Sequence, residues 1–251
     1  MQDHKVALVS LFVTNDIKKN FIRIKEAVED AHKKGCELIC FPECSLTGLV
    51  MTNDYEYDFG LAEKISGKAT DGLSELARKY DVYIAIGLLE RDGERLYDSA
   101  LLFNNEGKIV LKYRRINPQW HRTDSPIFYS EGSELQSIHI PLGKVAFAIC
   151  GDIFDEKVVA MIQNEKPDYL IVPLSRSCEK FSKEWWNNEE KGVYAQQIAK
   201  IGIESFLINS FESGFKWPSF GGTMVVSKDG SIIAETEPGA PSFLEFQCCR
   251  R

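Results

Sequence analysis

The stretch Val145-Ala146-Phe147-Ala148-Ile149-Cys150-Gly151-Asp152 decides the fold class. Five apolar residues run without interruption into a cysteine, and such a run is typical of a strand buried on both faces, as in α/β sheets. A helix-like segment begins at Glu156, and open α/β sheets bind ligands where a strand gives way to a helix. Cys150 therefore lies where a nucleophile would be useful, although a buried structural cysteine is the commoner case.

Strands alternate with helices at both ends of the chain. Lys5–Val13 and Leu38–Phe41 predict strands around a helix that begins at Asn15 or Asp16 and ends near Lys34, which is a βαβ unit. Further strands are expected at 82–88, 99–103, 108–114, 138–140, 145–149, 169–172, 206–209, 222–226, 232–234 and 243–246, further helices at 72–80, 156–164 and 181–200, and a long connection at 53–72. Two sheets packed face to face with helices outside would bury strands this apolar. Since no linker or repeat interrupts the pattern, residues 1–251 are expected to form one mixed α/β domain.

Composition excludes several classes of function. The chain has 251 residues and a formal net charge of −7, which argues against nucleic acid as a partner. No apolar run approaches the roughly 18 residues that cross a bilayer, and the first residues lack the apolar stretch of a signal peptide. Seven irregularly spaced cysteines without a Cys-x-x-Cys, and only four histidines, predict a reduced cytoplasmic protein without a structural zinc site.

Glu43 is an acid that follows the second predicted strand. It lies in Phe41-Pro42-Glu43-Cys44-Ser45, directly after the strand ends. A carboxylate at such a position can be partly desolvated, which makes it a usable base near neutral pH. An exposed loop glutamate is the ordinary alternative.

A basic segment, Lys108 to Arg115, supplies a candidate cation. Side chains alternate along a strand, so Leu111, Tyr113 and Arg115 share one face, and Lys112 lies on the other. Leu111 and Tyr113 favour the core side, which makes Arg115 the cation that points inward. A cysteine nucleophile needs a base to take its proton and a cation or N–H groups to hold the oxyanion. A glutamate, a cation and a cysteine at strand ends meet that need.

These motifs in this order resemble the nitrilase superfamily of carbon–nitrogen hydrolases. The resemblance rests on Phe-Pro-Glu at 41–43, Lys-Tyr-Arg-Arg at 112–115 after a Gly-Lys turn, and Ile-Cys-Gly-Asp at 149–152. It extends over nearly the whole chain, including the segment 167–173 and Gly-Gly-Thr at 221–223. It implies a four-layer αββα sandwich, a Glu-Lys-Cys triad with a second glutamate, and a homodimer, with no cofactor or metal.

The resemblance assigns roles to particular positions. Glu43 matches the base and Cys150 the nucleophile, while the position of the family's lysine holds Arg115. Lys112 precedes the matching element and would substitute only if a bulge reverses the strand. The oxyanion site and pocket are then expected to contain Gly151, Asp124, Trp120 and Ser175, with Asp124 as the acid nearest to the second glutamate.

Arginine at the lysine position separates the functional hypotheses. It keeps the positive charge that holds an oxyanion but cannot give up a proton near neutral pH. The first hypothesis is an amidase that acts on a small amide through a Cys150 thioester with Glu43 as base. The alternatives are a silent member that binds a ligand or partner, an enzyme that transfers the acyl group to an amine, and a papain-like pair of Cys150 with His121.

Overall fold

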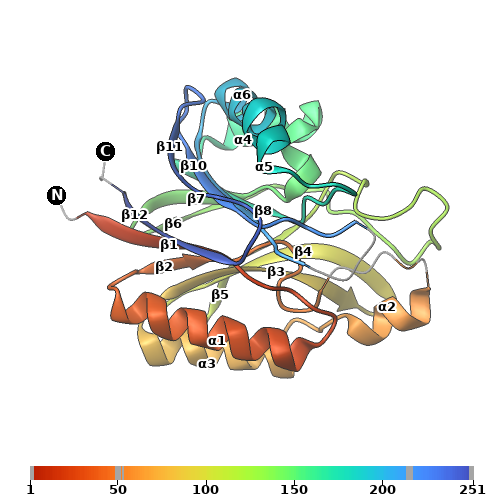
Figure 1. Cartoon of the computed structure of the whole chain (residues 1–251). Coiled ribbons are helices and arrows are strands. Elements are labelled where there is room, and N and C mark those ends of the chain that lie inside the picture. Colours follow the sequence, from red (N-terminus) through yellow and green to blue (C-terminus); the bar gives the residue numbers. More distant parts are fainter. Residues whose placement is uncertain (1–2, 49–51, 53, 213–216, 249–251) are drawn as a thin grey trace.

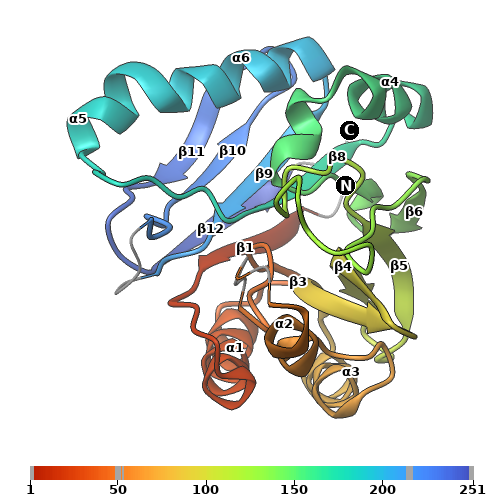
Figure 2. The ribbon, with the colours of Figure 1, turned by 90° about the vertical axis from the view of Figure 1, so that its right-hand side faces the viewer.

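The computed structural model describes residues 3–48, 52, 54–212 and 217–248, and within them two six-stranded sheets pack face to face (Figure 1). Helices α1 and α3 cover the outer face of one sheet, and α4 and α6 cover the other. The arrangement confirms the predicted four-layer αββα sandwich. Figure 2 shows the same layers from the side.

The first sheet has the strand order β12-β1-β2-β3-β4-β5. β1, β2 and β3 are parallel to one another, whereas β12, β4 and β5 join in antiparallel register. Its elements are β1 (His4–Ser10), α1 (Ile17–Lys33), β2 (Leu38–Cys40), α2 (Tyr55–Leu61), α3 (Lys68–Tyr80), β3 (Tyr83–Asp92), β4 (Arg95–Phe103), β5 (Ile109–Arg114) and β12 (Ser242–Cys248).

The second sheet has the strand order β11-β10-β9-β8-β7-β6, with β7, β8 and β9 parallel. Its elements are β6 (Ser137–Ile140), β7 (Gly143–Phe147), a short 3₁₀ helix η1 (Cys150–Phe154), α4 (Glu156–Glu165), β8 (Tyr169–Leu174), α5 (Lys183–Trp185), a π-helical turn η2 (Trp186–Glu190), α6 (Lys191–Ile201), β9 (Glu204–Asn209), β10 (Thr223–Val226) and β11 (Ile232–Thr236).

The apolar strands are buried on both faces, as their sequences predict. Val6 and Leu8 of β1 belong to the core between the sheets, whereas Ala7 and Val9 belong to the core under α1 and α3. All four are at most 4% exposed. Because successive side chains of a strand point to opposite faces, one continuous apolar run supplies two separate cores.

The structure corrects two boundaries in the expected connection at 53–72, of which residue 53 lies outside the described part. The helix α2 forms inside it, and the Asp54 side chain caps it by accepting a hydrogen bond from the Tyr57 N–H. The next helix, α3, begins at Lys68 instead of Gly72. Gly72 lies within this helix, where a glycine lets α3 pack closely on α1, since a Cβ there would lie 2.7 Å from the ring of Phe21.

No helix in the described residues is both long and apolar enough to span a membrane. Within the described part, Cys36, Cys40, Cys44, Cys150 and Cys178 form no disulfide bond.

Candidate active site

Three strand ends deliver the predicted residues to one pocket. Glu43 follows β2, Arg115 follows β5, and Cys150 opens η1 after β7. All three line a cavity of about 370 Å³, a volume suited to a small molecule. The complete lining is Glu43, Arg115, Gln119, Trp120, Cys150, Gly151, Phe154, Ser175, Arg176, Ser177, Glu190 and Tyr194.

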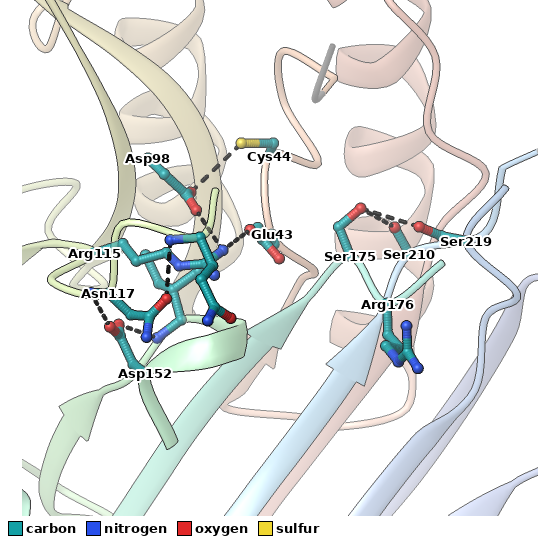
Figure 3. A network of polar contacts seen from close by, with 12 residues as sticks. Glu43, Cys44, Asp98, Arg115, Asn117, Asp152, Ser175, Arg176, Ser210 and Ser219 are labelled. Carbon is teal, nitrogen blue, oxygen red and sulfur yellow. Dashed lines mark hydrogen bonds and ion pairs between the residues drawn. The ribbon is translucent and has the colours of Figure 1, made fainter. Parts of the chain in front are cut away.

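Glu43 and Arg115 form a buried ion pair. Arg115 Nη1 donates to Glu43 Oε1 at 2.8 Å, and the side chains of Arg115 and Glu43 are only 4% and 1% exposed (Figure 3). The other carboxylate oxygen, Glu43 Oε2, is buried without a hydrogen-bond partner among the described residues. One oxygen of Glu43 is thus fixed by a cation, while the second is free to accept a proton.

Cys150 has backbone geometry unlike that of an ordinary strand residue. Its φ of 48° lies in the left-handed region, which is costly for a residue with a side chain and is tolerated where a site requires it. Burial, followed by the negative charge of Glu43, raises the pKa of the Cys150 thiol to about 12. The backbone N–H of Ser175 hydrogen bonds to the sulfur and acts in the opposite direction. The free thiol is therefore protonated at neutral pH, and it needs a base at the moment of attack.

Strand alternation decides between Arg115 and Lys112. Leu111 and Tyr113 are buried and Arg115 continues their face into the pocket, which confirms the predicted facing. Lys112 points the other way, is 40% exposed and bonds to Glu90 Oε1 at 3.1 Å. A register shift occurs near Phe103, between β4 and β5, but it does not turn Lys112 inward. Arg115 lines the pocket and Lys112 does not.

Arg115 is positively charged in the pocket. Burial lowers the pKa of its guanidinium, and the negative charges around it, led by Glu43, raise that pKa by more. Arg115 therefore stays protonated throughout the range in which the protein is folded. It can stabilise negative charge in the pocket but cannot act there as an acid.

Asp152 fastens the two halves of the site together. Its Oδ1 accepts hydrogen bonds from the N–H groups of Ile116 and Asn117 at 3.2 and 2.8 Å. Its Oδ2 accepts from the Tyr113 hydroxyl at 2.7 Å and from the Ile149 N–H at 2.9 Å. One buried carboxyl therefore links the turn that carries Arg115 to the turn that carries Cys150.

Three further expected residues do line the pocket. Gly151 packs against Arg115, because a Cβ on Gly151 would lie 2.7 Å from Arg115 Nη2. Trp120 is 2% exposed. The hydroxyl of Ser175 interacts with those of Ser219 and Ser210 at 3.0 and 3.2 Å on the opposite side of the site (Figure 3).

Asp124 and His121 lie elsewhere. Asp124 is 62% exposed and pairs with Arg122, and it does not line the pocket, so its expected place in the pocket is wrong. The loop between β5 and β6 carries it outward. His121 contacts Glu131 at 2.6 Å and also does not line the pocket, which removes the papain-like pairing with Cys150.

Sequence reasoning missed Asp98, an acid of β4 that the structure places beside Arg115. An acid within the mostly apolar segment from Leu96 to Phe103 is the signal that could have found it. It also missed Glu190 on the far wall of the pocket, whose Oε1 accepts a hydrogen bond from Arg176 Nε at 2.6 Å. These come from segments too far apart in the chain for a local pattern to connect.

Among the described residues, no group of three or more histidine, cysteine or acidic side chains could hold a metal ion.

Comparisons with known proteins agree with the geometry. A family model described as carbon-nitrogen hydrolase matches residues 5–243. The omega-amidase NIT2 of Mus musculus is 30% identical over 182 residues, covering 69% of this chain and 64% of that protein. This chain therefore spans 64% of the length of the first curated relatives that it matches, which is less than two thirds.

Solved structures show the same fold. Nit3 of Saccharomyces cerevisiae, a member of branch 10 of the nitrilase superfamily, superposes with a TM-score of 0.80 at 20% identity, covering 98% of this chain and 90% of that one. An amidase from Nesterenkonia sp. gives a TM-score of 0.78 at 18% identity, covering 97% and 89%. Because a family model matches nearly the whole chain, this protein belongs to the carbon-nitrogen hydrolase family.

Proposed function

We propose that the protein is an amidase that hydrolyses a small amide through a thioester on Cys150, with Glu43 as the base and Arg115 as the oxyanion-stabilising cation. One observation carries the proposal: Glu43, Arg115 and Cys150 line a single pocket, with one oxygen of Glu43 held by Arg115 and the other unpartnered among the described residues. The relatives named as omega-amidases and the amidase fold support amides as the substrate class.

The first half of the reaction forms the thioester. Glu43 takes the proton of the Cys150 thiol as the sulfur attacks the amide carbon, and a C–S bond forms. The carbonyl oxygen becomes an oxyanion, which the Arg115 guanidinium and the Gly151 N–H stabilise. The intermediate then collapses, the C–N bond breaks, and Glu43 returns the proton to the leaving nitrogen, which departs as ammonia or an amine.

The second half releases the acid. Water enters the space that the amine has left, and Glu43 Oε2 takes one of its protons while the oxygen attacks the thioester. The C–S bond breaks, and Glu43 gives the proton back to the Cys150 sulfur. Arg115 donates hydrogen bonds in both halves and transfers no proton, so its inability to act as an acid does not block the cycle.

The proposal is tested with Cys150→Ala and Glu43→Gln, assayed by ammonia release from a panel of small amides. Both variants should keep the wild-type circular dichroism spectrum and lose turnover. Loss of about 10³-fold or more is expected for each, since the nucleophile and its base act as a unit. If Cys150→Ala kept full activity, the thioester mechanism would be abandoned.

Two other outcomes would select the alternatives. A wild-type protein that forms hydroxamate when hydroxylamine is added, faster than it releases acid, would be an acyl transferase.

A protein that releases no ammonia, and whose cysteines react slowly and evenly with iodoacetamide by intact mass, would be a silent member of the family. A single fast adduct at Cys150 supports the amidase. In a mutant of the amidase from Nesterenkonia sp. AN1, acrylamide adds to the active-site cysteine, so acrylamide is a suitable second probe.

The homodimer and the cytoplasmic location stay predictions, the first from the resemblance and the second from the cysteine pattern. Light scattering coupled to gel filtration tests the first, and fractionation of the source cells tests the second.

A further inference from the structure

Asp98 is a buried acid that the mechanism above does not use. It lies on β4, its side chain is 0% exposed, and its Oδ2 is 3.4 Å from Arg115 Nη1, the same nitrogen that bonds to Glu43 (Figure 3). The Cys44 thiol donates to its Oδ1 at 3.6 Å. Asp98 therefore shares the single guanidinium with Glu43.

Asp98 holds both ends of Arg115. Its backbone carbonyl accepts the Arg115 N–H at 2.8 Å, which fixes where the arginine side chain starts. Its carboxyl contacts the guanidinium, which fixes where the side chain ends. An arginine side chain has many rotamers, and confining it to one costs conformational entropy. Because these contacts already confine Arg115 in the folded protein, that cost does not recur when substrate binds.

The charges in this cluster show which form of Asp98 fits. Arg115 supplies one positive charge, Glu43 must be negative to act as a base, and Asp98 is in direct contact with both. A second negative charge here would be buried without a matching cation, which is strongly unfavourable. The other neighbouring groups, Cys44, Cys150 and Asp152, offer no further positive charge.

We propose, on the basis of the amidase function above, that Asp98 is a positioning residue: a neutral carboxylic acid that holds the Arg115 guanidinium against Glu43. Burial, followed by the negative charge of Glu43, raises the pKa of Asp98 well above the usual range of an aspartate, in agreement with the geometry. A neutral Asp98 lies beside Glu43 without repelling it and leaves the charge of Glu43 balanced by Arg115 alone.

The test compares Asp98→Ala with Asp98→Asn. Alanine removes the carboxyl, whereas asparagine keeps its shape, an oxygen for Arg115 and an N–H for Glu43, without a charge. Because a misplacement of about 1 Å in an active site can cost about 100-fold, Asp98→Ala should lower kcat by about that factor and leave KM within about threefold. Asp98→Asn should restore kcat to within about tenfold of the wild type.

Glu90 provides the matched control. It is an equally buried acid of the same sheet, 2% exposed, and it bonds to Arg114 and Ser99 away from the pocket. Glu90→Ala and Glu90→Gln should leave both kcat and the rate of Cys150 alkylation by iodoacetamide unchanged at a temperature where they are folded. A fall in alkylation that is confined to Asp98→Ala separates positioning from a general loss of stability.

The pH profile of kcat/KM tests the neutral form, and it needs only Asp98→Asn, so it holds even if Asp98→Ala does not fold. If Asp98 is neutral, its replacement should leave the apparent pKa values of the kcat/KM profile within about half a unit of the wild-type values. If Asp98 is charged, its replacement should shift them by about 1–3 units. Such a shift, or an Asp98→Asn variant as inactive as Asp98→Ala, would overturn the proposal. A folded Asp98→Ala variant with wild-type kcat and alkylation would do so too.

The alkylation readout separates this inference from the amidase assignment. If the wild type turns over no amide, the proposed function fails. The rate at which Cys150 alone reacts in the wild type and in Asp98→Ala still decides whether Asp98 positions the base and the cation.

Discussion

Replacing Gly151 by alanine should damage the site through one atom of Arg115. The new Cβ would lie 2.7 Å from Arg115 Nη2 and 3.2 Å from Asn117 Oδ1. Non-bonded atoms of this kind settle at about 3.4 Å or more, so the guanidinium must retreat by about 0.7 Å. Arg115 is 4% exposed and bonded to Glu43, and it cannot move aside without loosening that bond. The backbone at Gly151 is not in the left-handed region, so alanine itself adds no backbone strain.

The size of the effect follows from that displacement. A shift approaching 1 Å should cost about 10- to 100-fold in kcat, which corresponds to about 1.4–2.7 kcal/mol of transition-state stabilisation. Overpacking should lower stability by about 1–3 kcal/mol, and the lower entropy of the unfolded chain with alanine returns about 0.4–1 kcal/mol. The activity should therefore fall by a much larger factor than the fraction of folded protein does.

A double-mutant cycle with Arg115→Lys isolates the cause. Lysine lacks the Nη2 atom that the new Cβ would meet, so Gly151→Ala should cost less than about threefold when it is combined with Arg115→Lys. The measurement is kcat for the wild type, both single variants and the double variant, and close pairs typically couple by about 0.5–3 kcal/mol. An equal cost of alanine in both backgrounds would refute the reasoning from steric overlap.

Further predictions concern residues around the site. Lys112→Ala should leave kcat/KM within about twofold and cost less than about 1 kcal/mol, because its bond to Glu90 is partly exposed; a large loss of activity would make Lys112 the functional cation. Burial raises the pKa of Glu212 from 4.5 to about 7. Between these two pH values the native protein keeps a proton that the unfolded chain releases, so the free energy of unfolding falls as the pH rises from 4.5 to 7. The free energy of unfolding of Glu212→Gln, measured in urea, should therefore rise relative to that of the wild type by up to about 3 kcal/mol between pH 4.5 and pH 8. A difference between the two proteins that does not change with pH would contradict this. Asp152→Asn places an amide N–H among donors and should cost about 2–4 kcal/mol in the same assay, whereas an unchanged midpoint would mean that Asp152 does not fasten the two turns.

The facing of Arg115 could be predicted from sequence because it is a local property. The two-residue period of a strand places Leu111, Tyr113 and Arg115 on one side whatever the strand packs against. Both apolar residues are buried, and the arginine enters the pocket with them. The same rule placed Lys112 on the outside.

The surroundings of that arginine could not be predicted, because they depend on contacts between distant segments. Glu43 and Arg115 are 72 positions apart in the chain. Asp98 meets them only because β4 lies between β3 and β5 in the sheet. Asp124 is much closer to Arg115 in sequence, yet its loop leads away from the pocket, so proximity along the chain was misleading.

Helix α2 was missed for a different reason. Its residues, Tyr55 to Leu61, mix aromatic and acidic side chains without the apolar spacing that marks an amphipathic helix. The only strong signal is Asp54 at the cap, and a capping residue without a periodic segment after it also occurs in ordinary turns.

The division of the site between two sheets has a consequence for folding. Glu43 and Arg115 follow strands of one sheet and Cys150 follows a strand of the other, so a chain whose sheets have each formed but have not docked contains all three proposed catalytic groups without the pocket that joins them. Chains of this size commonly pass through partly folded intermediates. In such an intermediate Cys150 is not yet beside Glu43 and Arg115, so the proposed amide turnover, which needs all three groups in one pocket, reports directly on how completely the two sheets have docked.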